Sequence, residues 1–168
     1  MLVRFLMKMN NTNYYNYPIE HYFEMIIRPA TKNDISEILG LLYELGRPKA
    51  KTKPQRAKFE KQIIQYITEK QLAVAKVDSV VVGVVSMILV PRLNQTRLEM
   101  YIPELVVSSK YQKMGVGKAL IDYVVSVAKK KNCYRIRLES GHARKESHRF
   151  YSHLGFEQYA KTFKLELS

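Results

Sequence analysis

Apolar residues recur at the three- and four-residue spacing of an amphipathic helix in four separate stretches of the chain. The first stretch runs from Ile35 to Leu45, the second from Pro54 to Ile67, and the longest from Gly115 to Lys131. A shorter stretch covers residues 145–154 and stops before Gly155, a residue type that commonly ends helices. The pattern therefore predicts four helices.

Between these helices, apolar and β-branched residues alternate or run together over short lengths, which is typical of strands. The expected strands are Met25–Arg28, Leu72–Val77, Val80–Val90, about Leu98–Val107, Tyr134–Glu139 and a final pair within Phe156–Leu167. Proline cannot donate a hydrogen bond to a sheet, so a bulge or an edge is expected near Pro103 and Glu104. The order of elements predicts one α/β domain with a mixed sheet of about seven strands.

Residues 1–24 follow a different pattern, in which asparagines and tyrosines interleave without a sustained helical or strand period. The apolar stretch after Arg4 is too short for a secretory signal, and no small-residue cleavage site follows it. We expect residues 1–24 to be an N-terminal extension or a misassigned start, outside a core domain of residues 25–168. The alternative is a short arm that packs on the domain or on a neighbouring subunit.

Composition limits the class of protein and of partner. The chain has 168 residues, 46% of them hydrophobic, which suffices for one domain with a core. No apolar run approaches the ~18 residues of a membrane-spanning helix. A lone cysteine, Cys133, excludes an internal disulfide, so we expect a reduced, cytoplasmic setting. The net charge of +13 predicts an anionic partner, which nucleic acid, a membrane surface or a phosphorylated cofactor would satisfy.

The stretch Val106–Ala119 is the most informative part of the chain. A β-rich run enters a basic loop, Gly115 and Gly117 follow, and the longest helix begins. Amides at the start of a helix lack intrahelical partners and can receive a phosphate, and glycine lets the ligand approach the backbone. The spacing matches neither the dinucleotide fingerprint nor the Walker loop. On the glycines alone, a relaxed helix start beside surface lysines is an equal alternative.

Two motifs resemble those of a known family. Gln112-Lys113-Met114-Gly115-Val116-Gly117 resembles the acyl-CoA-binding signature Q/R-x-x-G-x-G/A of the GNAT superfamily of N-acetyltransferases, in its small bacterial form. Phe150-Tyr151-Ser152-His153-Leu154-Gly155-Phe156 resembles the F-Y-x-x-L-G-F ending of the same family. The expected order of elements after Met25 also matches, so the resemblance extends over residues 25–168.

The resemblance implies a mixed sheet with helices on both faces and a splay between its fourth and fifth strands, here Leu98–Val107 and Tyr134–Glu139. The pantetheine arm of acetyl-CoA enters that splay in the family, and the loop amides hold its pyrophosphate. The cofactor-binding residues expected on this basis are Val106, Val107, Gln112, Lys113, Met114, Gly115, Val116, Gly117, Lys118, Ala119, Arg144 and His148.

Two side chains are candidates for acetyl transfer, which needs a neutral amine and benefits from a proton for the leaving thiolate. Tyr151 matches a tyrosine that acts as general acid in many members, and a phenol with a pKa of about 10 stays protonated at neutral pH. Packing or cofactor binding is its alternative role. Glu104, beside the expected bulge, is the candidate general base. Its alternatives are a salt-bridged surface glutamate, a water chain as the base, and Glu99 as a weaker competitor.

Arg144 stands where many relatives carry an asparagine, which leaves the acceptor open. His148 lies three residues before Tyr151 on the same helix face, where packing is as good an interpretation as ligand binding. No spacing of histidines and carboxylates matches a metal site, and Cys133 is expected to be a structural thiol.

The sequence thus predicts an acetyl-CoA-dependent N-acetyltransferase that moves an acetyl group directly to a primary amine. The expected acceptor is a small molecule of aminoglycoside, amino sugar or amino acid type. No metal and no membrane partner are expected, and the resemblance allows a homodimer. Two alternatives stay open: a basic nucleic-acid-binding module, for which no recognised motif is present, and a non-catalytic acyl-CoA-binding sensor of the same fold.

Overall fold

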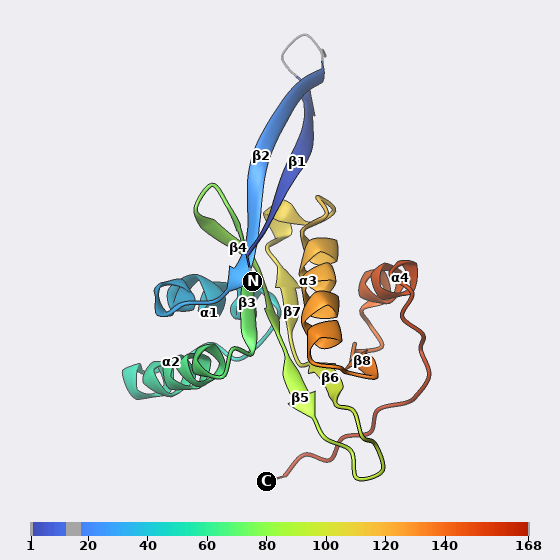
Figure 1. Cartoon of the computed structure of the whole chain (residues 1–168). Helices are drawn as coiled ribbons and strands as arrows, with labels where there is room; N and C mark the ends of the chain where they lie inside the picture. The colour runs from blue at the N-terminus through green and yellow to red at the C-terminus, as the bar shows by residue number, and fades with distance from the viewer. Residues whose placement is uncertain (1, 13–17, 168) are drawn as a thin grey trace.

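The computed structural model describes residues 2–12 and 18–167 (Figure 1). Their α-helices are α1 (Ile35–Glu44), α2 (Lys53–Thr68), α3 (Val116–Lys130) and α4 (Lys145–His153). Their strands are β1 (Val3–Thr12), β2 (Pro18–Pro29), β3 (Leu72–Val77), β4 (Val80–Ser86), β5 (Ile88–Val90), β6 (Glu99–Ile102), β7 (Leu105–Val107) and β8 (Arg135–Leu138). Short 3-10 helices, η1 (Lys32–Asp34) and η2 (Ser109–Tyr111), precede α1 and the loop before α3. Each helix predicted from the apolar spacing is present.

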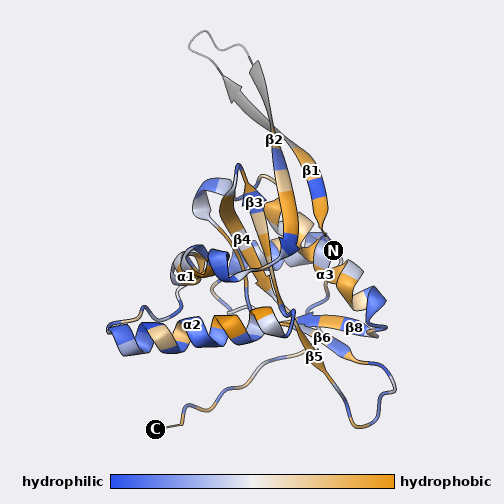
Figure 2. Cartoon of the chain, turned by 60° about the vertical axis from the view of Figure 1, so that its left-hand side comes forward, coloured by the Kyte–Doolittle hydropathy of each residue, from blue (hydrophilic) through white to orange (hydrophobic). Residues whose placement is uncertain are grey.

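The strands lie between two layers of helices. α1 and α2 cover one face, and α3 and α4 cover the other (Figures 1 and 2). In β3, Leu72 and Val74 belong to the apolar cluster of α1 and α2, whereas Ala73 and Ala75 belong to the cluster of α3. Because successive residues of a strand point to opposite faces, a strand buried on both faces is continuously apolar. The expected arrangement of helices on both faces is confirmed.

The strands part in the middle of the sheet. They form two hydrogen-bonded groups, in the orders β1-β2-β3-β4-β7 and β5-β6-β8. β6 and β7 are one run interrupted at Pro103 and Glu104, as the proline predicted. β6 pairs in parallel with β8, whereas β7 leaves β8 and pairs antiparallel with β4. The expected splay between the Leu98–Val107 strand and the Tyr134–Glu139 strand is therefore confirmed.

The N-terminal residues join the sheet as a hairpin. β1 pairs antiparallel with β2 along its whole length, from Val3 opposite Ile27 to Thr12 opposite Pro18. Val3 and Phe5 pack against the apolar cluster of α3. The strand expected to begin at Met25 begins at Pro18 instead, because backbone pairing with β1 extends it beyond the apolar run that starts at Met25. The boundary expected at residue 25 thus falls inside β2, and the asparagine- and tyrosine-rich residues 13–17 lie outside the described residues.

The C-terminal segment differs from the prediction. The structure assigns no strand to residues 156–167, so the expected final strand pair is wrong. Phe163, Leu165 and Leu167 are 90%, 86% and 88% exposed, and the segment runs away below the sheet (Figure 1). A strand exists only where another backbone accepts its hydrogen bonds, and an alternating pattern by itself does not provide that partner.

Candidate active site

The interruption between β6 and β7 holds Glu104 in a defined position. Its amide donates to Oγ of Ser86 at 2.9 Å, and the Ser86 hydroxyl lies 2.7 Å from Oε2 of the Glu104 carboxylate. The Ser86 amide donates to the carbonyl of Glu104 at 2.9 Å. The other carboxylate oxygen, Oε1, accepts a hydrogen bond from Arg47 at 3.1 Å. The half-buried carboxylate is thus fixed from the end of β4 and from the residues after α1.

A cavity of about 300 Å³ opens where β7 leaves β8, and we call it the splay cavity. It is lined from the bend before β7, the end of β8, the start of α4 and the end of α1. The lining residues are Leu45, Arg47, Ile102, Pro103, Glu104, Leu105, Leu138, Glu139, Ser140, Gly141, Arg144, Ser147 and Tyr151. Glu104 and Tyr151, the expected base and acid, are therefore brought to one cavity.

Two features of the splay cavity suit an elongated ligand with amide groups. Oγ of Ser140 is buried and has no hydrogen-bond partner within the described structure. A buried hydroxyl without a partner is unfavourable, so a ligand atom that pairs with it is stabilised. β7 is the outermost strand of its group, and its edge toward the cavity pairs with no described strand. Sequence reasoning missed Ser140, although its position two residues after the end of β8 was a usable signal.

Tyr151 lies in an aromatic cluster beside this cavity. Its ring centroid is 5.2 Å from that of Phe150 and 5.7 Å from that of Phe156, both edge-on. Burial raises the pKa of the Tyr151 hydroxyl, and the nearby charge of Arg144 offsets only part of that rise. The phenol therefore stays protonated at neutral pH and above, which is the state that a proton donor requires.

The loop before α3 has the geometry of an anion site. Lys113 and Gly115 have positive φ angles of 62° and 82°, and Gly115 caps α3. The first amides of a helix have no carbonyl partner within it and carry the positive end of its dipole. The side chain of Gln112 donates to the carbonyl of Val107 at 3.3 Å, and Lys118 pairs with Asp122 at 2.7 Å. Both side chains are engaged within the protein, whereas the Lys113 side chain is exposed in the same loop.

The other cofactor residues predicted near this loop differ in how far their side chains are buried. The side chains of Val106, Val116 and Ala119 are buried in the two apolar clusters, and the amide of Ala119 already donates to the carbonyl of Gly115 at 3.0 Å. Val107 and Met114 are half-buried. The structure thus brings the expected residues to one strand-to-helix junction.

Gly117 has a packing role that the sequence did not indicate. A Cβ atom at Gly117 would lie 3.1 Å from Cζ of Phe150 and 3.8 Å from Cγ2 of Val107. The missing side chain therefore lets the start of α3 close on α4 and β7. Because Phe150 contacts Tyr151, this packing also positions the candidate acid.

Arg144 and His148 occupy different positions. The guanidinium of Arg144 donates to the carbonyl of Leu45 at 2.8 Å and links the start of α4 to the end of α1. Nε2 of His148 lies 3.0 Å from the carbonyl oxygen of Gly141. Arg144 lines the splay cavity and His148 does not, so the structure places one of the two predicted residues at this site.

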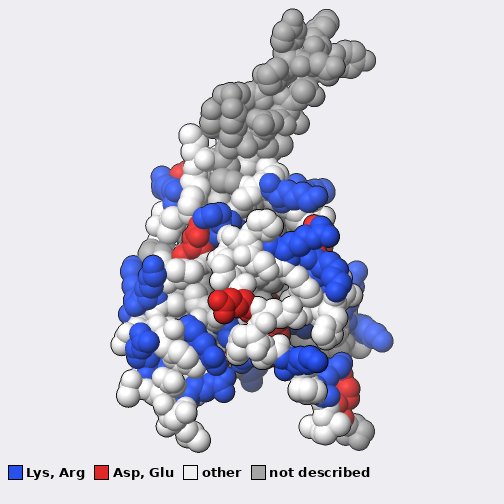
Figure 3. Space-filling model, turned by 90° about the vertical axis from the view of Figure 1, so that its right-hand side faces the viewer, with Lys and Arg blue, Asp and Glu red and all other residues white. Residues whose placement is uncertain are grey.

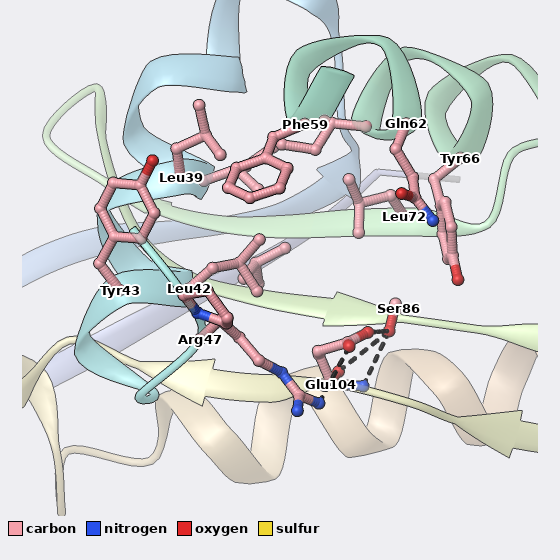
Figure 4. Close-up of a pocket in the computed structure, with 14 residues that line it drawn as sticks. Leu39, Leu42, Tyr43, Arg47, Phe59, Gln62, Tyr66, Leu72, Ser86 and Glu104 are labelled. Atoms are coloured by element: carbon pink, nitrogen blue, oxygen red, sulfur yellow. Dashed lines mark hydrogen bonds and ion pairs between the residues drawn. The ribbon is translucent and has the colours of Figure 1, made fainter. Parts of the chain in front are cut away.

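A second cavity, of about 270 Å³, lies between α1, α2 and the sheet, and we call it the helix cavity (Figure 4). Phe59 projects into it from α2, and Leu39 and Leu42 project from α1 (Figure 4). Arg47 and Glu104 line both cavities. The Glu104 carboxylate therefore lies between two compartments, one of which is bordered by Tyr151.

Glu99, the weaker candidate base, is excluded by its surroundings. Its side chain is 0% exposed and pairs with Arg92, Arg135 and Arg137 at 2.9, 2.5 and 3.0 Å. Burial alone raises the pKa of Glu99, but the hydrogen bonds from the three arginines outweigh it and lower that pKa to about 2. A carboxylate with three cationic partners holds β6, β8 and the loop before β6 together instead of accepting protons from a substrate.

The surface charge suits an anionic ligand. On the face that carries α3 and α4, Lys and Arg side chains outnumber Asp and Glu and surround a central region where a small acidic group is visible (Figure 3). Burial raises the pKa of the Cys133 thiol, which agrees with a structural role for this residue.

The described residues contain no group of three side chains suited to holding a metal ion. They also include no helix that is both long and apolar enough to cross a membrane.

Comparison with known proteins identifies related sequences. Residues 34–156 match the model of the Acetyltransferase (GNAT) family. Glucosamine 6-phosphate N-acetyltransferase of Trypanosoma brucei brucei is 32% identical over 88 residues, which are 52% of this chain and 58% of that protein. The match thus spans less than two thirds of that relative.

Solved structures share the fold. A transcriptional regulator from Bacillus halodurans C-125 superposes with a TM-score of 0.78 at 25% identity, over 85% of this chain and 99% of that one. An aminoglycoside N-acetyltransferase solved in complex with CoA superposes with a TM-score of 0.74 at 19% identity, over 89% and 98% of the two chains. At that identity, the second likeness concerns the fold alone.

Proposed function

The chain belongs to the GNAT family of acetyltransferases, and from this premise we propose that it transfers the acetyl group of acetyl-CoA directly to the primary amine of a small molecule. The observation that carries the proposal is the position of Glu104 between two cavities, with Tyr151 at one of them. A direct transfer requires the acceptor nitrogen to reach the thioester carbonyl with a proton-accepting group within hydrogen-bond reach, and a carboxylate that lines both cavities supports this arrangement.

We assign the donor to the splay cavity and the loop before α3. The first amides of α3 face the pyrophosphate, and the surrounding basic face attracts the phosphate charges. The free edge of β7 and the unpaired hydroxyl of Ser140 suit the amide groups of the pantetheine arm. The relative solved with CoA supports this assignment through its fold.

We assign the proton transfers to Glu104 and Tyr151. Glu104 takes a proton from the ammonium form of the acceptor, so that the amine lone pair can attack the thioester carbonyl. The C–N bond forms and the C–S bond breaks, and Tyr151 gives its hydroxyl proton to the departing thiolate. The acetylated nitrogen loses its second extra proton through water to the Tyr151 phenolate, which restores the phenol, and water removes the proton on Glu104. His148 is left without a role in these steps.

The proposal is tested by release of the CoA thiol from acetyl-CoA in the presence of a panel of primary amines. We expect amine-dependent release at pH 7 that falls by roughly 10²-fold or more in Glu104→Gln, with the acetyl-CoA Kd unchanged. Glu146→Gln, on the exposed face of α4, is the matched control and keeps full activity. Tight binding of acetyl-CoA without thiol release for any amine would favour the sensor alternative, and binding of nucleic acid alone would favour the basic module.

A further inference from the structure

The helix cavity is apolar over most of its lining. The apolar contributors come from both helices and from the sheet: Ile38, Leu39, Leu42, Pro48, Phe59, Ile63, Leu72 and Val84. Its polar side chains are Tyr43, Arg47, Gln62, Tyr66, Ser86 and Glu104. The ionic pair lies together at one side, next to Ser86 (Figure 4). Sugar hydroxyls placed against the apolar part would be left without hydrogen-bond partners, which is unfavourable, whereas an apolar body would be stabilised there.

The charges of this cavity also limit the acceptor. Glu104 is the carboxylate that lines it, and Arg47 already pairs with that carboxylate. One carboxylate can neutralise one ammonium group. An aminoglycoside carries several such groups, and the net charge of +13 repels a polycation. A phosphorylated amino sugar needs a cation for its phosphate, and the guanidinium at this cavity is engaged with Glu104.

We propose that the acceptor is a monoamine with an apolar body, an arylalkylamine or an alkylamine, bound with its nitrogen at Glu104 and its apolar part between α1 and α2. This inference rests on the proposed function and narrows it, because the amino sugar and aminoglycoside classes expected from the sequence do not suit the lining. The substrate class follows from Phe59 and Leu42 on one side and the single carboxylate on the other.

The test compares kcat/KM for 2-phenylethylamine, hexylamine, glucosamine 6-phosphate and kanamycin at saturating acetyl-CoA. We expect at least a tenfold preference for the two apolar amines over the other two. Phe59→Gln is expected to raise the KM for 2-phenylethylamine more than tenfold and to leave the acetyl-CoA KM unchanged. Leu93→Gln, a similar change at a fully exposed loop position, is the matched control. Leu42→Gln provides a second cavity variant in case Phe59→Gln does not fold.

The outcomes separate this inference from the proposed function. Acetylation of glucosamine 6-phosphate or kanamycin in preference to the apolar amines overturns the acceptor class and leaves the acetyltransferase activity established. An unchanged KM for 2-phenylethylamine in both folded cavity variants overturns the location of the apolar body. If no thiol is released with any of the four amines or with any amine of a wider panel, both the proposed function and this inference are overturned.

Discussion

The guanidinium of Arg47 lies 3.1 Å from Oε1 of Glu104, although 57 residues separate the two in the chain. Arg47 follows Gly46, whose φ of 93° ends α1 and turns the chain toward the sheet. Both side chains line both cavities. An ammonium group that approaches this oxygen of Glu104 must therefore share it with the charged guanidinium of Arg47 or displace that group, and the ion pair opposes binding of the acceptor.

Arg47→Gln is expected to lower the KM for a cationic amine by up to about fivefold. Breaking a partly exposed ion pair costs roughly 0–1 kcal/mol, and the acceptor no longer has to supply that free energy. Steady-state kinetics at saturating acetyl-CoA measure the change. Arg56→Gln removes an ion pair of similar exposure, with Glu60 on α2, and is the control that leaves KM unchanged. A raised KM in Arg47→Gln would show instead that Arg47 helps to bind the acceptor.

Tyr151→Phe is expected to lower kcat by ~10²–10⁴-fold, because it removes the hydroxyl that protonates the thiolate and keeps the ring among Phe150 and Phe156. The loss is expected to shrink with an acyl donor whose leaving thiol is more acidic, since its thiolate needs less assistance. Tyr123→Phe, at a buried tyrosine of α3 outside both cavities, is the control. If kcat of folded Tyr151→Phe stays within about threefold of wild type, Tyr151 is a packing residue.

Local patterns in the sequence predicted most of the fold that surrounds the donor. The spacing of apolar residues indicated all four helices, and Pro103 indicated the break that positions Glu104. The loop Gln112–Lys118 was recognisable because the residues that resemble the family signature are consecutive in the chain. Features of this kind are encoded within a few residues of one another.

The parts that were missed depend on contacts between distant segments. Ser86 and Arg47 meet Glu104 from 18 and 57 residues away, and neither belongs to a local motif. The β1–β2 hairpin escaped notice because asparagines and tyrosines dominate the segment and hide a short alternation, in which Val3 and Phe5 pack on the core while Arg4 and Leu6 are exposed. The opposite error occurred at Phe163–Leu167, where a clear alternation has no partner strand in the described chain.

Gly117→Val is expected to weaken acetyl-CoA binding by well over tenfold and to destabilise the protein. Replacing a glycine within a helix normally gains up to ~1 kcal/mol of stability, but here the first added carbon lies 3.1 Å from Phe150. Overpacking of this kind costs roughly 1–3 kcal/mol, so the unfavourable contact prevails. Calorimetric titration and thermal melting measure the two effects.

Two further variants test whether contact with Phe150 causes the loss of stability in Gly117→Val. Gly40→Ala, in α1, meets no atom within 4 Å and is expected to keep the acetyl-CoA affinity and to gain stability. Adding Phe150→Leu to Gly117→Val is expected to recover part of the lost stability, because the shorter side chain leaves room for the valine. Unchanged affinity in a folded Gly117→Val protein would remove this loop from the donor site.

Glu99 is expected to make the stability of the protein depend on acidity below about pH 4.5. Its pKa is about 2 in the folded protein, against 4.5 for an ordinary glutamate, so the unfolded chain binds the proton more readily. The stabilisation is complete above about pH 4.5 and is lost as the pH falls toward 2, and the difference in pKa corresponds to about 3 kcal/mol. In a chain of this size that free energy shifts Tm by roughly 7–14 °C.

Thermal melts of wild type and Glu99→Gln between pH 2 and pH 7 measure this dependence. At pH 7 the variant is expected to melt well below wild type, since Arg92, Arg135 and Arg137 lose their shared carboxylate. The difference is expected to shrink as the pH falls from 4.5 to 2, because protonation then removes the same charge from wild type. Glu139→Gln, an exposed partner of Arg137, is the control with little effect at any pH. A Tm difference that stays constant across this range would mean that Glu99 stabilises the fold through packing and not through its charge.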